Sequence, residues 1–304
     1  MTIEILRKYC RDKLTNIYGQ QEASSIVQLV LKHYTGLSLT RLLSNVGREI
    51  DADQEINIRN AINELVTHKP LQYVLGEAAF YGLTLKVTPS TLIPRPETEE
   101  LVAWIIDSNQ VQAPAILDIG TGSGCIAISL AKHINGATVL ALDISAGAIA
   151  TARQNAGLNQ VKLKLVQADI ISYATDNQFD VIVSNPPYVT QAEKKFMQPN
   201  VLQFEPAQAL FVEDSKPLVF YETISHFAAK SLCAQGFLYF EINERYGQET
   251  LRLLQQQGFV NCQLRKDLFG KDRMVRGQKN KYRNPNIIFF LSIAQFFFIV
   301  SSFL

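Results

Sequence analysis

The chain has 304 residues, of which 47% are hydrophobic and 19% charged, with 29 basic and 28 acidic side chains. That length allows about two domains, and the composition excludes a disordered chain, a collagen-like repeat and a disulfide-dense small protein. A formal net charge of +1 lacks the domain-wide basic excess that is typical of nucleic-acid-binding proteins.

The four cysteines and four histidines are scattered, without the paired spacing of a zinc site or a disulfide framework. We therefore expect no metal and a reducing compartment. The first residues alternate charged and apolar side chains and lack the apolar segment of a signal peptide. The main part of the chain is predicted to be cytoplasmic.

Residues 1–75 are predicted to form a small helical bundle. Apolar side chains recur at three- and four-residue steps, as in Ile3, Leu6 and Cys10, and again from Ile58. Glycines and a Lys-Pro pair interrupt the pattern between the helices. Such stripes usually form a helix-packing core, and we interpret them in that way rather than as a cofactor pocket.

Residues 76–96 are predicted to be a β-hairpin and linker. The segment from Phe80 to Val87 alternates and is rich in β-favouring residues. Two prolines then stiffen the connection, and Glu97 and Glu99 follow at the start of a helix, where the helix dipole favours negative charge.

Residues 97–278 alternate short apolar runs with helix-like stretches and are predicted to form a second, larger domain. This alternation implies an α/β fold with a mostly parallel sheet and helices on both faces. The predicted strands are Ala115–Ile119, Thr138–Asp143, Lys162–Ala168, Phe179–Ser184, Phe237–Ile242, Phe259–Leu264 and Arg273–Gly277.

The first of these strands ends in Asp118 and leads into a glycine-rich loop. Gly120, Gly122 and Gly124 would let the backbone turn sharply and approach a ligand, while the following helix start offers free N–H groups. The second strand ends in Asp143, where a carboxylate would accept hydrogen bonds from ribose hydroxyls. Together these features predict a nucleoside-type cofactor.

The loop has the form G-x-G-x-G, whereas dinucleotide-binding loops have the form G-x-G-x-x-G. The carboxylate of Asp118 would disfavour a pyrophosphate, but it suits a sulfonium cofactor that carries a positive α-amino group. S-adenosylmethionine is therefore favoured over NAD. After the third strand, Asp169 would accept a hydrogen bond from the adenine amine and Ile170 would cover the ring. The predicted cofactor-binding residues are Asp118, Gly120, Thr121, Gly122, Ser123, Gly124, Asp143, Asp169, Ile170 and Asn185.

The fourth strand runs into Asn185-Pro186-Pro187-Tyr188, the most specific signal in the chain. Two consecutive prolines fix φ and supply carbonyl groups without competing N–H groups. The Asn185 amide oxygen and the Pro186 carbonyl would each accept one N–H of a planar –NH2 group, and Tyr188 would add an aromatic wall. We predict Asn185, Pro186 and Tyr188 as catalytic residues, with Pro187 completing the substrate-binding set. The aspartates and Asn185 all end successive strands, the edge at which open α/β sheets bind ligands.

These two motifs resemble those of class I S-adenosylmethionine-dependent methyltransferases that act on planar amino groups. The fuller resemblance is to the release-factor glutamine methyltransferases, the HemK/PrmC family, and it covers residues 1–278. Further shared residues are Ile93-Pro-Arg-Pro-Glu-Thr-Glu, Phe204-Glu-Pro, Ala209-Leu, Gly236-Phe-Leu, Asp267, Gly270 and Arg273.

The resemblance implies a class I methyltransferase (Rossmann-like) fold with a helical N-terminal domain, and S-adenosylmethionine as the cofactor. It also implies methyl transfer to the side-chain amide nitrogen (N5) of the glutamine in the Gly-Gly-Gln motif of peptide-chain release factors. The N-terminal domain and the hairpin would hold the release factor. No residue is a convincing general base, and proton loss after transfer would suffice.

Three other functions compete with this one. A nucleic-acid amino-methyltransferase would also hold a planar –NH2, but residues 1–278 carry 26 basic and 28 acidic side chains, and we expect no nucleic-acid partner. An NAD-dependent oxidoreductase leaves the motif at Asn185 unexplained. A non-catalytic binding protein would have little reason to keep both motifs.

The C-terminal extension, residues 279–304, differs from the rest of the chain. Its last eighteen residues, from Ile287 to Leu304, include fourteen apolar side chains and no charge, and three basic residues precede them. Eighteen apolar residues reach the lower limit for a membrane anchor, with the basic residues on the cytoplasmic side. The alternative, which we favour, is an aberrant C-terminus such as a shifted reading frame would produce. Membrane contact is expected only if the extension is an anchor.

Overall fold

The computed structural model describes residues 1–44 and 46–281. They form two compact units, one of Met1–Ala78, Lys86–Ile93 and Lys195–Pro206, the other of Ala79–Leu85, Pro94–Lys194 and the chain from Ala207 onward. The domain boundaries at residues 75, 96 and 278 stay predictions, and the apolar run at residues 287–304 lies outside the described residues. Within the described ranges, no helix has the length and apolar character needed to cross a bilayer.

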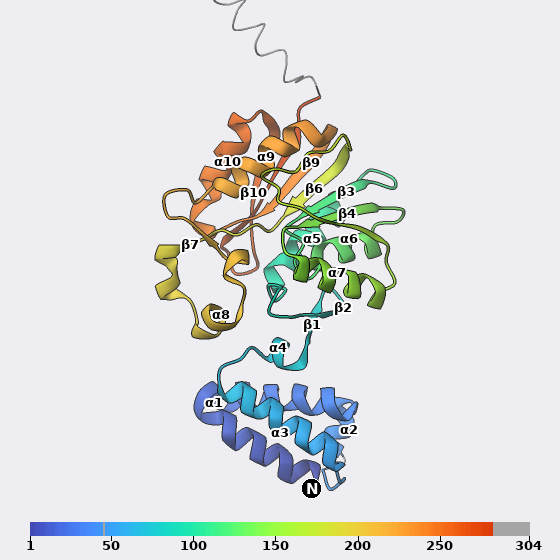
Figure 1. The fold of residues 1–304 in the computed structure, drawn as a ribbon, viewed down its shortest axis with the longest axis vertical. Helices are drawn as coiled ribbons and strands as arrows, with labels where there is room; N and C mark the ends of the chain where they lie inside the picture. Colours follow the sequence, from blue (N-terminus) through green and yellow to red (C-terminus); the bar gives the residue numbers. More distant parts are fainter. Residues whose placement is uncertain (45, 282–304) are drawn as a thin grey trace, which may run out of the picture. The chain divides into compact units, whose positions relative to one another are not determined.

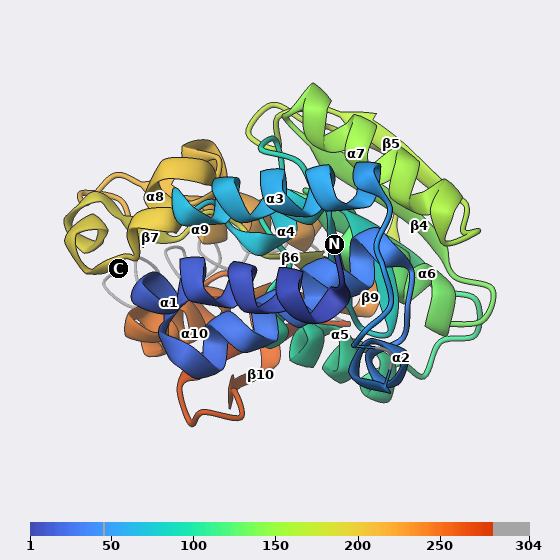
Figure 2. The same cartoon turned by 90° about the horizontal axis from the view of Figure 1, so that it is seen from below.

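The first unit is built from packed helices, as the apolar stripes predict. Figure 2 shows α1 and α3 running side by side. The helix α1 is kinked at Gly19, which has φ 75°, and ends at Gly36, which has φ 67°. Both positions are glycines because residues with a side chain rarely adopt positive φ. The helices are α1 (Ile3–Thr35), α2 (Leu39–Ser44), α3 (Ala52–Val66), α4 (Leu71–Leu75) and α8 (Pro199–Phe204).

A segment from the middle of the chain completes the first unit. Phe204, in α8, packs against a small apolar cluster that includes Tyr73 and Ile93. The next residue, Glu205, accepts a hydrogen bond from the Ile93 backbone N–H at 3.3 Å. The Phe204-Glu-Pro motif therefore has a packing role in this unit.

The predicted hairpin is present as β1 (Glu77–Phe80) and β2 (Leu83–Lys86), which pair in a two-stranded sheet. Its turn residues, Tyr81 and Gly82, both have positive φ (47° and 74°). Positive φ at both central residues is the geometry of a two-residue hairpin turn that matches strand twist.

The second unit is a sheet covered by helices (Figure 1). Within the described chain, seven strands form the large sheet in the order β10-β11-β9-β6-β3-β4-β5, and β11 is antiparallel to both neighbours while the other pairs are parallel. The strands are β3 (Ala115–Ile119), β4 (Thr138–Asp143), β5 (Leu163–Gln167), β6 (Phe179–Ser184), β9 (Leu232–Glu241), β10 (Phe259–Lys266) and β11 (Asp272–Lys279). The short strands β7 (Val189–Thr190) and β8 (Phe211–Val212) form a separate pair.

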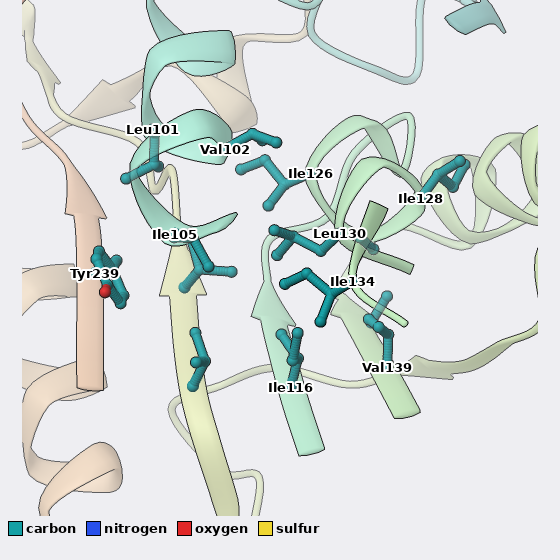
Figure 3. Close-up of a cluster of buried hydrophobic side chains, with 14 of the residues drawn as sticks. Leu101, Val102, Ile105, Ile116, Ile126, Ile128, Leu130, Ile134, Val139 and Tyr239 are labelled. Atoms are coloured by element: carbon teal, nitrogen blue, oxygen red, sulfur yellow. The ribbon is translucent and has the colours of Figure 1, made fainter. Parts of the chain in front are cut away.

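Alternate side chains of the central strands enter two different apolar layers. Ile116 on β3 and Val139 on β4 pack with α5 (Pro96–Ser108) and α6 (Cys125–His133), as Figure 3 shows. Leu117 and Leu140 point the opposite way, into the layer formed with α9 (Val219–Ser231) and α10 (Gly247–Gln256). The helix α7 (Ala146–Leu158) contacts β4 and β5. The predicted fold, a mostly parallel sheet with helices on both faces, is confirmed.

The strands largely match their predicted bounds, but β9 begins five residues earlier than predicted. Its pairing with β6 shifts between Phe179 and Val181, and Gln235 has φ 66° at this irregularity. A Cβ at Gly236 would come within 2.9 Å of the Asp180 carbonyl oxygen. The alternation of apolar residues starts only after this bulge, so the sequence pattern predicted the second part of the strand alone.

Candidate active site

The register of the central strands brings their carboxyl ends to one edge. Ile119 of β3 pairs with Leu142 of β4 and with Ser184 of β6, and Ser184 pairs with Phe240 of β9. The residues that follow these positions therefore share one level of the sheet, and they are Gly120, Asp143, Asn185 and Glu241. Ligands bind at this edge in open α/β sheets.

Asp118 is fully buried at the end of β3. Its Oδ2 accepts hydrogen bonds from the Thr121 hydroxyl at 2.6 Å and the Ala127 backbone N–H at 3.2 Å. Within the part of the chain that the structure describes, its Oδ1 has no hydrogen-bond partner. Burial raises the pKa of Asp118 to about 7, although the two donors oppose the rise. A buried, unpaired carboxylate oxygen is costly, and a cationic ligand group would satisfy it.

The glycine-rich loop turns directly after Asp118. Gly122 has φ 56°, and a Cβ added there would meet nothing within 4 Å. At Gly124, with φ 83°, a Cβ would instead lie 2.9 Å from Ile128 Cδ1 and 3.2 Å from Ala152 Cβ. One glycine therefore leaves open space beside the loop, while the other lets α6 and α7 approach each other closely. Asn155 of α7 donates to the Ser123 carbonyl at 2.8 Å and fixes the loop.

Asp143 and Asp169 lie at the ends of the next two strands. The Asp143 carboxylate accepts from the backbone N–H groups of Gly122 at 2.8 Å and Ser145 at 2.9 Å, so it holds the glycine-rich loop itself. Burial raises the pKa of Asp143. Asp169 accepts from its own turn, at Ile171 N–H, and Ile170 is buried against the sheet. Each Asp143 oxygen keeps a second lone pair for a ligand hydroxyl.

The loop after β6 contains Asn185, Pro186 and Tyr188, and hydrogen bonds to other segments hold it in place. The Asn185 Nδ2 donates to the Thr98 hydroxyl at 3.4 Å, and the Tyr188 hydroxyl donates to Glu241 Oε1 at 3.1 Å. Asn243 donates to the Tyr188 carbonyl at 3.1 Å. Ser184, just before the motif, donates from its hydroxyl to the Ile119 carbonyl at 2.7 Å and so ties β6 to β3.

Two acceptors of this loop are unused. Among the described residues, no hydrogen bond reaches the Asn185 Oδ1 or the Pro186 carbonyl oxygen. Proline has no N–H of its own to compete, so both oxygens are left for a donor outside the chain. A pair of adjacent acceptors suits a planar –NH2 group, which has two N–H donors.

Sequence reasoning missed Glu241 altogether and assigned Thr98 no role at the site. Both are buried, and the Thr98 hydroxyl donates to Glu241 Oε2 at 2.6 Å. The signal for Glu241 was present, since it is a carboxylate at the end of a largely apolar strand, like Asp118 and Asp143. The contact with Thr98 joins residues 143 positions apart and leaves no local pattern.

The shared residues Asp267 and Arg273 also meet at the end of β9. Arg273 Nε donates to Asp267 Oδ2 at 3.1 Å, and its Nη1 lies 3.5 Å from the Ile242 carbonyl oxygen. This pair fixes the backbone directly after Glu241. The positive charge of Arg273 also lowers the pKa of Glu241, but burial raises that pKa by more.

The fold and the residues at its ligand-binding edge define a class I methyltransferase. The "Methyltransferase small domain" model matches residues 99–212, and the "PrmC N-terminal domain" model matches residues 6–76. A methyltransferase structure from Pyrococcus furiosus superposes with a TM-score of 0.50 at 18% identity, over 76% of this chain and all of that one, and shows the fold.

Curated relatives narrow the class to a family. The release factor glutamine methyltransferase of Flavobacterium psychrophilum is 44% identical, over 91% of this chain and 99% of its own length. The protein of the same name from Bacteroides thetaiotaomicron is 40% identical, over 89% of this chain and 98% of its own. The chain belongs to the release factor glutamine methyltransferase family.

Proposed function

We propose that this enzyme transfers a methyl group from S-adenosylmethionine to the side-chain amide nitrogen of the glutamine in the Gly-Gly-Gln motif of release factors. The observation that carries the proposal is the pair of unused acceptors, Asn185 Oδ1 and the Pro186 carbonyl, in the loop after β6, the strand that neighbours β3 and its glycine-rich loop. Relatives at 40–44% identity are named for this activity.

The chain's own residues fit S-adenosylmethionine. The unpaired Oδ1 of buried Asp118 suits its cationic α-amino end, Gly122 leaves space for close approach, and Asp143 retains acceptor capacity for ribose hydroxyls. Asp169 and Ile170 would serve the adenine. When bound, the cofactor supplies an electrophilic methyl group.

An amide nitrogen is a poor nucleophile because its lone pair is delocalised into the carbonyl group. Asn185 and Pro186 would bind both of its N–H groups and so fix the nitrogen in one orientation. Positioning of this kind supplies a large part of the rate enhancement in enzymes. The same acceptors would stabilise positive charge as it develops on the nitrogen.

The further features of this proposal are a cytoplasmic location, release factors as partners and a substrate-binding role for the first unit. The family supports release factors as partners, and the size of such a partner supports the role of the first unit, since a short peptide would leave a second unit without a function. The scattered cysteines support the location. We expect no nucleic-acid substrate.

The test is mass spectrometry of a class I release factor after incubation with the enzyme and S-adenosylmethionine. We expect one added methyl group on the Gly-Gly-Gln glutamine. Replacing Asn185 with alanine should lower turnover by about 100- to 1,000-fold, the scale of losing a transition-state hydrogen bond, while S-adenosylmethionine still binds. Asn177→Ala, at an exposed asparagine of the same unit, is the matched control. Unchanged turnover in Asn185→Ala would refute the role of this motif.

A nucleic-acid base is the alternative acceptor, because an exocyclic amine is also a planar –NH2 group. Parallel reactions with tritiated cofactor should label the release factor and leave DNA and ribosomal RNA unlabelled. Label that appears only in nucleic acid would reverse the assignment.

A further inference from the structure

Two buried polar side chains lie behind Asn185, and methyl transfer as described does not use them. Thr98, in the first turn of α5, is 2% exposed, and Glu241, at the end of β9, is 1% exposed. Thr98 belongs to the Pro-Glu-Thr-Glu segment, which is shared with the family. Burying a carboxylate is costly unless it is well hydrogen-bonded, so Glu241 needs an explanation.

Both oxygens of Glu241 accept from hydroxyl groups. Thr98 Oγ1 donates to Oε2 at 2.6 Å, and Tyr188 donates to Oε1 at 3.1 Å. Burial raises the pKa of Glu241, and the two hydroxyl donors and Arg273 oppose that rise. The carboxylate thus links α5 to the loop that contains the substrate-binding motif.

When Glu241 is ionised, the chemistry of these groups fixes the direction of each hydrogen bond. An ionised carboxylate only accepts, and a threonine hydroxyl has a single proton. Because Thr98 donates that proton to Glu241, the Thr98 oxygen can only accept a hydrogen bond from Asn185. The Asn185 side chain must therefore turn its –NH2 group towards Thr98, as the 3.4 Å contact from Nδ2 shows.

This direction matters because an asparagine amide has two nearly isosteric orientations. With Nδ2 on Thr98, Asn185 Oδ1 stays available as an acceptor. In the reversed orientation Asn185 would present N–H donors to a substrate amine that is itself a donor. The contact with Thr98 favours the acceptor orientation over the reversed one.

We propose that Thr98 and Glu241 are positioning residues for methyl transfer, which act by holding the Asn185 amide with its oxygen facing the substrate nitrogen. The inference rests on the proposed function of Asn185. It adds a role for two side chains that do not themselves touch the substrate.

Two substitutions at Thr98 separate this role from simple packing. Thr98→Val keeps the shape and removes the hydroxyl, whereas Thr98→Ser keeps the hydroxyl and removes a methyl group. We expect Thr98→Val to lower kcat about tenfold, because misplaced reacting groups lose rate steeply. Thr98→Ser should stay within about threefold of the wild type. A packing role predicts the reverse order, because valine fills the site and serine leaves a cavity.

The measurements are kcat, the KM for the release factor, and the dissociation constant for S-adenosylmethionine by calorimetry. Rates are referred to the concentration of cofactor-binding sites, so unfolded protein does not count. The cofactor affinity should stay unchanged in both variants. A valine variant within twofold of wild-type kcat, or a serine variant as slow as valine, would overturn the proposal. A wild-type enzyme that fails to methylate the release factor would refute the proposed function instead.

Discussion

Two buried carboxylates end strands of the same sheet, and their surroundings differ in one respect. Asp118, the next-to-last residue of β3, has one oxygen satisfied and one without a partner within the described chain. Glu241, the last residue of β9, has both oxygens satisfied by hydroxyl groups of the protein. A carboxylate near the carboxyl end of a central strand can therefore have either a complete or an incomplete set of hydrogen-bond donors from the protein. We propose that the unpaired oxygen of Asp118 accepts from the cofactor, whereas Glu241, with both oxygens paired, positions the side chains around it.

The strongest way to test this contrast is to neutralise Asp118. Asp118→Asn should weaken S-adenosylmethionine binding roughly 100-fold, the scale of a lost hydrogen bond to a charged group. Calorimetric titration measures the loss. An affinity within about threefold of wild type would mean that the unpaired oxygen does not face the cofactor.

The same substitution should stabilise the cofactor-free protein at high pH. Because burial raises the pKa of Asp118 from 3.8 to about 7, the native state favours the protonated form. Its contribution to stability is complete below about pH 4 and is lost as the pH rises through 7. Asp118→Asn should therefore melt above wild type at pH 8, and the difference should shrink at pH 5. Equal differences at both pH values would contradict the assignment.

The loop after β3 depends on backbone geometry, whereas the end of β9 depends on side chains. Gly124→Ala should destabilise the protein by about 2–3 kcal/mol, since alanine must adopt positive φ and crowd Ile128 and Ala152. Chemical denaturation measures this loss. Gly157→Ala is the matched control, because its φ is not positive and a Cβ there would meet nothing within 4 Å. In that helical position alanine should be neutral or stabilising.

The smallest effect is expected for Glu241→Gln. The glutamine amide oxygen can still accept a hydrogen bond from the Thr98 hydroxyl. Its amide nitrogen, which is a donor, would take the place of the carboxylate oxygen that accepts from the Tyr188 hydroxyl. We expect a few-fold loss of kcat with cofactor affinity unchanged.

Burial raises the pKa of Glu241, so its contribution to stability is present at low pH and falls as the pH rises. The variant should therefore show a shallower decline of melting temperature between pH 5 and 8 than the wild type. A steeper decline would contradict this.

The sheet and half of the site could be predicted because their signals are local. Asp118 with its glycines, and Asn185 with its prolines, each combine an apolar strand with chemically distinctive residues in one short segment. Fold and family followed from those segments. The residues that hold the Asn185 side chain could not be predicted, because Thr98 and Glu241 lie 87 positions before and 56 positions after Asn185 in the chain.

The packing of Phe204 was hidden for the same reason. Nothing around this residue indicates that it joins a cluster with Tyr73 and Ile93, since contacts between distant segments leave no periodicity. The early start of β9 was missed because a bulge at Gln235 interrupts the alternation.

The hydrogen bond from the Ser184 hydroxyl to the Ile119 carbonyl has a consequence for the alignment of the site. It fastens the last residue of β6 to the last residue of β3, immediately before the acceptor pair and the glycine-rich loop begin. The two segments that form the candidate site are therefore joined directly at their bases, by this hydrogen bond and by the pairing of β3 with β6. We expect their alignment to be set when the sheet forms.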